Sequence, residues 1–330
     1  MSQTDVIVLA AGKGTRMLSD KPKVMHEIMG RPMIGHVVSA ATGLNPHKII
    51  VVTGHGREAV EDYLKSSPVS FAVQDPQLGT AHALLVCGDS LGSNDVLVLY
   101  GDVPLIQRQT LQSIMAIFAR SDGIVFMTTE TATPDGYGRV IMNDGCIEAI
   151  VEDNDATEEQ KKIREINTGI CMLRADRLPL LKKIGADNRK REYYLTDICL
   201  VAQREGIKVG AYHHPDSREV LGVNTRQDQT EANLIMKDRK LDLLLSQGVT
   251  LVSRDIYIES EVEVGRDSII YPNCYLGGRT RIGQGVVVWP NSVIIDSTVE
   301  DGAIIKGISR LEGAVVGRDT EVDPPVNFGA

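Results

Sequence analysis

Residues 5–17 read Asp5-Val-Ile-Val-Leu-Ala-Ala-Gly-Lys-Gly-Thr-Arg-Met17, an apolar run that leads directly into a glycine-rich basic turn. Residues 6–9 are only Val, Ile and Leu, which is typical of a strand buried on both faces of a parallel sheet. Gly12 and Gly14 allow the backbone to approach a ligand closely. Three cations accompany the turn: Lys13, Arg16 and Lys23. The stretch therefore predicts an α/β sheet with a polyphosphate site after its first strand.

Two common glycine motifs do not fit this turn. A Walker loop needs Gly-x4-Gly-Lys-Ser/Thr, whereas here the Lys lies between the two glycines. A dinucleotide fingerprint needs a third glycine, and this chain has Met17 there. The turn therefore indicates a different class of phosphate site.

Short apolar strands alternate with helical patterns up to about residue 225. The expected strands are 6–9, 48–52, 96–100 and 123–128, and the expected helices are 33–42, 58–65, 80–88 and 110–120. This βαβ order predicts a doubly wound, mostly parallel, Rossmann-like sheet with ligand groups at the carboxyl ends of its strands. We assign residues 1–225 to this domain and residues 226–250 to a helical linker, with its helix ending before Gly248.

From residue 251 onward the apolar pattern repeats every six residues. One register contains Ile258, Val264, Ile270, Leu276, Ile282, Val288 and Ile294. Small or β-branched residues stand two places earlier: Val262, Ser268, Cys274, Thr280, Val286 and Ser292. This period predicts a short left-handed parallel β-helix over residues 251–330, whereas an antiparallel β domain would alternate with period two. After Ile294 the register slips by one residue, to Val299, Ile305 and Leu311 and then Val322, which predicts a bulge or corner.

Composition excludes several classes of protein. A net charge of −9 over 330 residues argues against a nucleic-acid surface. The five cysteines are odd in number and lack a Cys-x-x-Cys pair, which predicts reduced thiols in the cytoplasm. We find neither a signal-peptide pattern nor an apolar run of ~18 residues, and therefore expect no membrane partner.

Two further segments carry polar groups next to predicted strands. Asp102 closes the apolar strand that ends at Tyr100, where a carboxylate either ligates a metal bound to nucleotide phosphates or only begins a turn. With the basic turn on another strand of the same sheet, we favour the metal. Residues 74–83 supply amides that suit the edge of a pyrimidine, with Thr80 as a helix cap as well and His82 packing or bonding locally.

These segments occur in the order found in one family. The later segments of this chain in that order are Gly136-Tyr-Gly-Arg139, Ile150-Val-Glu152, Ile166-Asn-Thr-Gly169, Glu192-Tyr-Tyr-Leu-Thr-Asp197 and Gly222-Val-Asn224. Over residues 5–225 the chain resembles the sugar-1-phosphate nucleotidyltransferases. Within them it is most similar to bacterial UDP-N-acetylglucosamine pyrophosphorylases, the uridylyltransferase half of the bifunctional GlmU family, whose members also carry a hexapeptide β-helix.

The resemblance implies a role for each matching residue. The uridine and ribose would contact Leu9, Ala10, Ala11, Gly12, Gln74, Gly79 and Thr80. Arg16 and Lys23 would grip phosphates, and Asp102 and Asn224 would hold Mg²⁺. The sugar phosphate would lie against Tyr100, Gly138, Glu152, Asn167 and Thr196. One position departs from the family: Asn154 stands where a Lys usually follows the Glu by two places, which could weaken sugar-phosphate binding or shift specificity.

The implied reaction joins UTP and N-acetylglucosamine 1-phosphate to give UDP-N-acetylglucosamine, a peptidoglycan precursor, and pyrophosphate. No enzyme nucleophile is required, and Arg16, Lys23 and Asp102 with Mg²⁺ would carry catalysis. A different sugar 1-phosphate or nucleotide, or a non-catalytic binding role, stays open as an alternative. The resemblance also implies a homotrimer through the β-helix. Since residues 251–330 contain no His, we expect no acetyltransferase site there.

Overall fold

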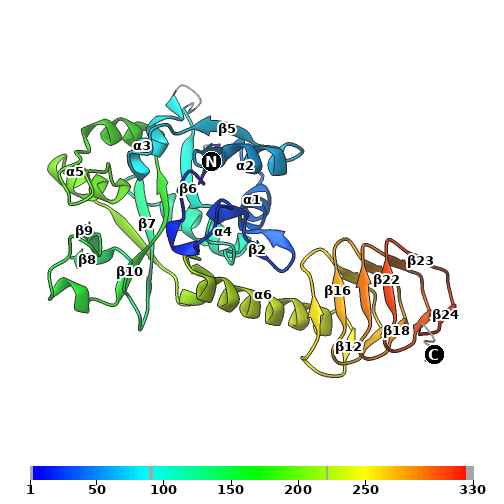
Figure 1. Ribbon diagram of the computed structural model, residues 1–330. Helices are drawn as coiled ribbons and strands as arrows, with labels where there is room; N and C mark the ends of the chain where they lie inside the picture. The colour runs from blue at the N-terminus through cyan, green and yellow to red at the C-terminus, as the bar shows by residue number, and fades with distance from the viewer. Residues whose placement is uncertain (1–2, 89–90, 92, 221, 325–330) are drawn as a thin grey trace. The chain divides into compact units, whose positions relative to one another are not determined.

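The computed structural model describes residues 3–88, 91, 93–220 and 222–324, in two compact units (Figure 1). The first unit comprises Met1–His26 and Pro32–Asp228, and the second comprises Glu27–Arg31 and Gln229–Ala330. The finer division into residues 1–225, 226–250 and 251–330 stays a prediction. Residues 325–330 of the predicted β-helix lie outside the described residues.

The first unit is built on a mixed sheet, nine-stranded within the described residues. Its main path runs in the order β11 (Gly210–His213), β7 (Ile124–Glu130), β10 (Glu165–Leu173), β6 (Asp95–Tyr100), β1 (Thr4–Leu9), β4 (Lys48–Thr53) and β5 (Ser70–Val73). The remaining strands, β8 (Arg139–Asn143) and β9 (Cys146–Val151), join through β10. Only β10 breaks the parallel order of the main path, pairing antiparallel with β6 and β7. The predicted doubly wound, mostly parallel architecture is confirmed.

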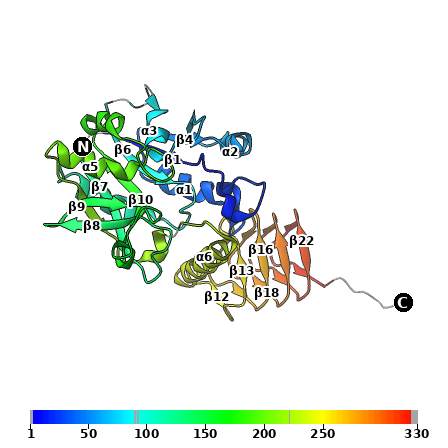
Figure 2. The same cartoon turned by 60° about the vertical axis from the view of Figure 1, so that its left-hand side comes forward.

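Helices cover both faces of this sheet (Figure 2). Alternate residues of β1 point to opposite faces, so Val6 and Val8 pack with α1 (Met33–Thr42), α2 (Arg57–Leu64) and α4 (Arg108–Phe118). Ile7 packs on the other face with α3 (Thr80–Leu85), α5 (Ile198–Arg204) and the 3₁₀ segment Ala175–Lys183. Burial on both faces explains the uninterrupted apolar run in β1. No helix in the described part of the chain combines the length and apolarity needed to cross a membrane.

Short elements also occur among the described residues before 230. They are the 3₁₀ turns Thr15–Met17, Lys23–Met25, Gln160–Lys162, Leu195–Asp197 and Ser217–Val220, and the two-stranded ribbon of β2 (Glu27–Ile28) and β3 (Arg31–Pro32). The long helix α6 (Arg226–Ser246) ends where the sequence predicts it to end, with Gly248 in the left-handed region at φ 86°.

Beyond α6, the second unit forms a left-handed parallel β-helix of three parallel sheets, as predicted. The first sheet contains β12 (Thr250–Leu251), β15 (Ile269–Ile270), β18 (Val287–Val288), β21 (Ile304–Ile305) and β24 (Glu321–Val322). The second contains β13 (Tyr257–Ile258), β16 (Tyr275–Gly277), β19 (Val293–Ile295) and β22 (Arg310–Glu312). The third contains β14 (Glu263–Val264), β17 (Arg281–Ile282), β20 (Thr298–Val299) and β23 (Val315–Val316).

The residues of the six-residue register stack on one another in the interior of this β-helix. All seven aliphatic positions from Ile258 to Ile294 and all six small positions before them are buried. The predicted slip also has a structural cause. Three residues, 278–280, join β16 to β17, whereas only 296–297 join β19 to β20, where Asp296 has φ 46°. The shorter corner recurs at 313–314, so Val316 is buried although the repeat did not predict it.

Candidate functional site

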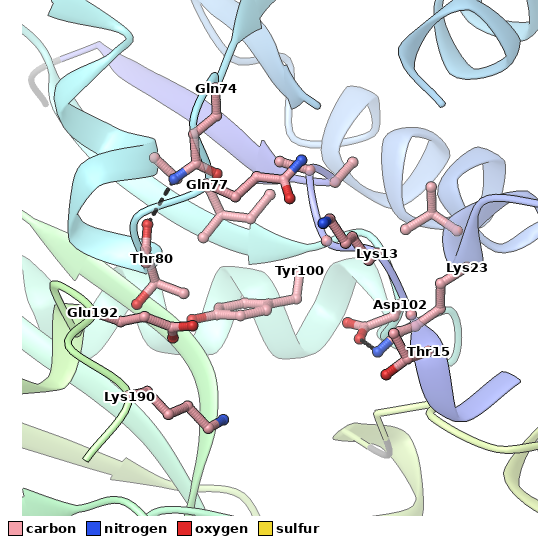
Figure 3. Close-up of a pocket in the computed structure, with 18 residues that line it drawn as sticks. Lys13, Thr15, Lys23, Gln74, Gln77, Thr80, Tyr100, Asp102, Lys190 and Glu192 are labelled. Carbon is pink, nitrogen blue, oxygen red and sulfur yellow. Dashed lines mark hydrogen bonds and ion pairs between the residues drawn. The ribbon is translucent and has the colours of Figure 1, made fainter. Parts of the chain in front are cut away.

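A cavity of about 600 Å³ opens in the first unit at the carboxyl ends of β1 and β6 (Figure 3). All seven residues predicted to contact the nucleoside line it: Leu9, Ala10, Ala11, Gly12, Gln74, Gly79 and Thr80. Lys13, Lys23, Tyr100 and Asp102 line the same cavity. Residues from four separate parts of the sequence therefore meet at one edge of the sheet, as expected for a doubly wound fold.

The two glycines of the basic turn serve different purposes. A Cβ built on Gly12 would have no atom within 4 Å, so this part of the backbone faces open space. Gly14 has φ 61°, and a Cβ there would lie 2.4 Å from Cβ of Lys23. Gly12 thus leaves room for a ligand, while Gly14 lets Lys23 pack against the turn.

Lys23 is the centre of a polar cluster at the floor of the cavity. Its ammonium group forms an ion pair with the carboxylate of Asp102 and donates a hydrogen bond to Oδ1 of Asn224 at 2.7 Å. Nη2 of Arg16 donates to the same amide oxygen at 2.8 Å. The structure therefore brings together the four residues predicted to handle phosphate and metal.

The start of α6 holds Asn224 in place. The side chain of Asp228 accepts hydrogen bonds from the backbone N–H groups of Asn224 and Thr225, and Oγ1 of Thr225 accepts one from the N–H of Asp228. This reciprocal pattern is a capping box. The backbone N–H of Val223 also donates to the carbonyl oxygen of Asp102 at 2.9 Å, so the two predicted metal ligands are linked through the main chain.

The oxygens of Asp102 and Asn224 suit a hard divalent cation. Both side chains converge on one positive charge, the ammonium group of Lys23. Mg²⁺ is commonly bound by one or two protein oxygens and completes its shell with substrate phosphates and water. Within the described residues there is no cluster of three or more His, Cys, Asp or Glu that would form a metal site from protein groups alone. The pair therefore fits a metal that is shared with a phosphate ligand.

A second wall of the cavity carries the amide residues. Nε2 of the buried Gln74 lies 2.8 Å from the carbonyl oxygen of Gly79, to which it donates, and 3.1 Å from Nδ1 of His82. His82 thus bonds locally, as expected. The predicted cap is wrong: Gly79, at φ 111°, is the N-cap of α3, and Oγ1 of Thr80 instead accepts a hydrogen bond from the N–H of Leu195.

Backbone hydrogen bonds join this wall to residues 193–195. The N–H of Tyr193 donates to the carbonyl oxygen of Leu78, and the carbonyl oxygen of Tyr193 accepts from the N–H of Ala81. A Cβ on Gly79 would lie 2.6 Å from the backbone oxygen of Tyr193, so only glycine allows this approach. We call this contact between 78–81 and 193–195 the backbone clasp.

A second cavity of about 510 Å³ adjoins the first. Its lining residues are Gly14, Thr15, Arg16, Lys23, Gly136, Glu152, Asp153, Asn154, Lys190 and Asn224. Four of these also line the first cavity: Gly14, Thr15, Lys23 and Lys190. The two spaces thus meet beside the phosphate-handling cluster.

Of the residues predicted to contact the sugar phosphate, only Glu152 lines the second cavity, while Tyr100 lines the first. Gly138, Asn167 and Thr196 line neither cavity, and of these Gly138 and Thr196 lie beside Glu152. Oγ1 of Thr196 donates to Oε1 of Glu152 at 3.0 Å, and the N–H of Asn167 donates to the carbonyl oxygen of Gly138. A Cβ on Gly138 would lie 3.5 Å from Oε1 of Glu152.

Burial raises the pKa of Glu152 above its usual value, although the hydrogen bond from Thr196 and the charge of Lys190 lower it in part. Burial also raises the pKa of Tyr100, so its phenol stays protonated. Glu152 is therefore a partly desolvated carboxyl group in a largely polar cavity. Such a group suits hydrogen bonding to a neutral polar part of a ligand.

Sequence reasoning missed Lys190 and Glu192 as lining residues. Lys190 reaches into the first cavity from a wall away from Lys13 and Lys23 (Figure 3). The available signal was the basic run at residues 189–191, directly before the Glu192-Tyr193 motif. It was overlooked because the run lies in an irregular segment without glycine or strand patterning.

Comparison with protein families and curated proteins agrees with this geometry. Residues 6–191 match the MobA-like NTP transferase domain, and residues 261–296 match the bacterial transferase hexapeptide repeat. The chain is 43% identical over 315 residues to the bifunctional protein GlmU of Syntrophotalea carbinolica, covering 94% of this chain and 68% of that protein. It is 42% identical over 323 residues to the bifunctional protein GlmU of Pseudomonas putida KT2440, covering 97% of this chain and 71% of that protein.

Solved structures show the same fold at lower identity. A UDP-glucose pyrophosphorylase complexed with UDP-glucose has a TM-score of 0.57 at 21% identity, covering 72% of this chain and 99% of that one. A putative glucose-1-phosphate thymidylyltransferase from Bacillus anthracis has a TM-score of 0.56 at 21% identity, covering 70% and 94%.

Proposed function

Since the chain belongs to the GlmU family and is a sugar-1-phosphate nucleotidyltransferase, we propose that it transfers UMP from UTP to N-acetylglucosamine 1-phosphate. The products would be UDP-N-acetylglucosamine and pyrophosphate. The observation that carries the proposal is the pair of adjoining cavities, which share Lys23 beside Asp102 and Asn224. A nucleotide in one and a sugar phosphate in the other would meet at that cluster.

In this proposal the first cavity takes the nucleotide. The segment from Leu9 to Gly12 and the amide wall of Gln74, Gly79 and Thr80 surround the uridine and ribose. Gln74 is held by Gly79 and His82, so its amide would meet the base in a fixed orientation. The triphosphate would extend over Gly12 toward Lys13 and Lys23.

The chemistry needs no covalent enzyme intermediate. A phosphate oxygen of the sugar phosphate would attack the α-phosphorus of UTP in line, and pyrophosphate would leave with the electron pair of the broken bond. Lys23 and Arg16 would bind the phosphates, orient them and offset the charge that develops. A divalent cation, which we propose to be Mg²⁺ held by Asp102 and Asn224, supplies further neutralisation of phosphate charge when bound.

The second cavity would take the sugar. Glu152, oriented by Thr196 and supported by the loop at Gly138, would accept hydrogen bonds from the sugar hydroxyls. Asn167 of β10, which lines neither cavity, would help to select the 2-acetamido group through the hydrogen bond that its N–H donates to the carbonyl oxygen of Gly138 beside Glu152. In the same proposal Lys23, which lines both cavities, and Arg16, which lines the second, would lie beside the phosphate of the sugar.

A substrate panel tests the proposal. Pyrophosphate release is measured with each pairing of UTP, dTTP, ATP or GTP with the 1-phosphates of N-acetylglucosamine, glucosamine and glucose, with and without Mg²⁺. We expect the highest kcat/KM for UTP with N-acetylglucosamine 1-phosphate. A higher value with another pair would establish the alternative substrate, and no release with any pair would favour a binding role.

For the β-helix we propose a role in assembly, as a homotrimer. We further propose that residues 251–330 provide no acetyl transfer to glucosamine 1-phosphate, because they contain no His to act as a general base. Thiol release from acetyl-CoA in the presence of glucosamine 1-phosphate and the chain, above a blank without enzyme, would contradict this second proposal.

A further inference from the structure

Four cations line the two cavities, and Lys190 differs from the others in its surroundings. Lys23 and Arg16 are engaged by Asp102 and Asn224, and Lys13 lines only the first cavity. Lys190 lines both cavities, and its ammonium group has no hydrogen bond or ion pair to any residue that the structure describes. A lysine at this junction without a protein partner is available to an anionic ligand.

The turn that carries Lys190 is held in a defined conformation. The side-chain amide of Asn188 donates to the carbonyl oxygen of Glu192 and its oxygen accepts from the N–H of Glu192, at 2.6 and 3.2 Å. The carbonyl oxygen of Asn188 accepts from the N–H of Arg191, which has φ 54°. One asparagine thus closes the turn at both ends and presents Lys190 at its tip.

A second set of contacts fixes where this tip lies. The N–H of Arg189 donates to Oδ1 of Asp155 at 3.3 Å, and the N–H of Asp155 donates to the carbonyl oxygen of Glu152. The turn is therefore tied to the 152–155 segment, which contributes Glu152, Asp153 and Asn154 to the second cavity. The positive charge of Lys190 also lowers the pKa of Glu152, which places the two groups within electrostatic reach.

The 152–155 segment itself supplies three acidic side chains and no cation. Asp153 is already paired with Arg139 at 3.0 Å, and the other cations that line the second cavity, Arg16 and Lys23, are engaged by Asn224 and Asp102. Glu152 lines the cavity beside a phosphate site that needs a further cation, one that no protein group engages. We propose that Lys190 supplies that cation by binding the phosphate of the sugar 1-phosphate. This inference rests on the proposed function, since it assumes that a sugar 1-phosphate occupies the second cavity.

Steady-state kinetics of Lys190→Ala and Lys190→Arg test the inference, with UTP and N-acetylglucosamine 1-phosphate varied separately. Loss of one charge-assisted contact should raise KM for the sugar phosphate about tenfold or more in Lys190→Ala. KM for UTP should stay within about twofold, and Lys190→Arg should retain most of the wild-type affinity. Lys182→Ala, an exposed lysine that lines neither cavity, is the matched control.

Three results would overturn the assignment: an unchanged KM for the sugar phosphate in Lys190→Ala, a larger rise in KM for UTP, or an equal loss in Lys190→Arg. Thermal unfolding of each variant identifies any misfolding, which we do not expect from an exposed side chain without a protein partner. If the wild-type chain turns over no sugar 1-phosphate at all, the proposed function fails, and this inference fails with it. Normal wild-type turnover with an unaffected Lys190→Ala refutes the inference alone.

Discussion

Replacing Asp102 by Asn tests the phosphate-handling cluster most directly. The change keeps the size and shape of the side chain but removes one negative charge. That charge lies in a confined place, since the side chains of Asp102 and Lys23 are 17% and 15% exposed. Solvent therefore screens it weakly, and a neutral amide would be a much poorer partner for a divalent cation.

The expected loss falls on kcat and not on folding. Removal of a group that offsets charge in the transition state costs about 100-fold or more, or about 2.7 kcal/mol at 1.36 kcal/mol per factor of ten. The fold retains its local links, because the carbonyl oxygen of Asp102 still accepts from the N–H of Val223 and Lys23 still donates to Asn224. We expect the free energy of unfolding to fall by only about 1 kcal/mol.

The assay is pyrophosphate release at saturating UTP and N-acetylglucosamine 1-phosphate over a range of Mg²⁺, together with thermal unfolding. Asp176→Asn is the matched control, because Asp176 forms an ion pair with Arg174 and lines neither cavity. Turnover by Asp102→Asn within about threefold of the wild type would refute the role assigned to this carboxylate. A collapse of thermal stability alone would show that Asp102 is structural.

Three further outcomes follow from the structure. Lys23→Ala should raise KM for UTP and lower kcat by about 100-fold while some metal binding remains, as followed by Mn²⁺ binding to the variant; a change in thermal stability alone would contradict the phosphate role. Glu152→Gln should be more stable than the wild type at pH 7, because burial raises the folded-state pKa of the carboxyl group. Chemical unfolding at several pH values should show that difference shrink as pH falls through the raised pKa and vanish below about 4.5, the ordinary pKa of a Glu side chain; a constant difference would contradict the assignment. Sedimentation at micromolar concentration should show a homotrimer through the β-helix, and a 36.0 kDa species throughout would exclude it.

Features in which the same type of residue recurs at a fixed spacing were the most predictable from the sequence. The stack from Ile258 to Ile294 was recoverable because each β-helix coil places the same side-chain type at the same interior position. The burial of Val316 was not predicted, because the corner at 313–314 is one residue shorter than the corner at 278–280 and moves the six-residue register again. The antiparallel β10 was equally hidden, since strand direction depends on pairing partners far away in the sequence.

The candidate site was predictable where a local sequence motif determines the position of its residues in the fold. Gly12 and Gly14 follow a buried strand, which places them at the edge of the sheet. The sequence predicted Thr80 as a helix cap because hydroxyl side chains are preferred at that position. In the structure, Oγ1 of Thr80 instead accepts a hydrogen bond from the N–H of Leu195, far away in the sequence. Lys190 was missed for a similar reason: only the tertiary contact of its turn with Asp155 brings it to the cavities.

The backbone clasp has a consequence for how the two substrates influence one another. It joins residues 78–81, on the nucleotide side, to residues 193–195, which continue directly into Thr196 beside Glu152. A base that restrains residues 78–81 would therefore also restrain the segment that orients the sugar-binding carboxylate. The conformational entropy of this shared segment is lost when the first ligand binds, and the second ligand does not lose it again. Each of the two substrates should therefore raise the affinity for the other. By thermodynamic reciprocity, the factor by which UTP tightens sugar-phosphate binding should equal the factor by which the sugar phosphate tightens UTP binding.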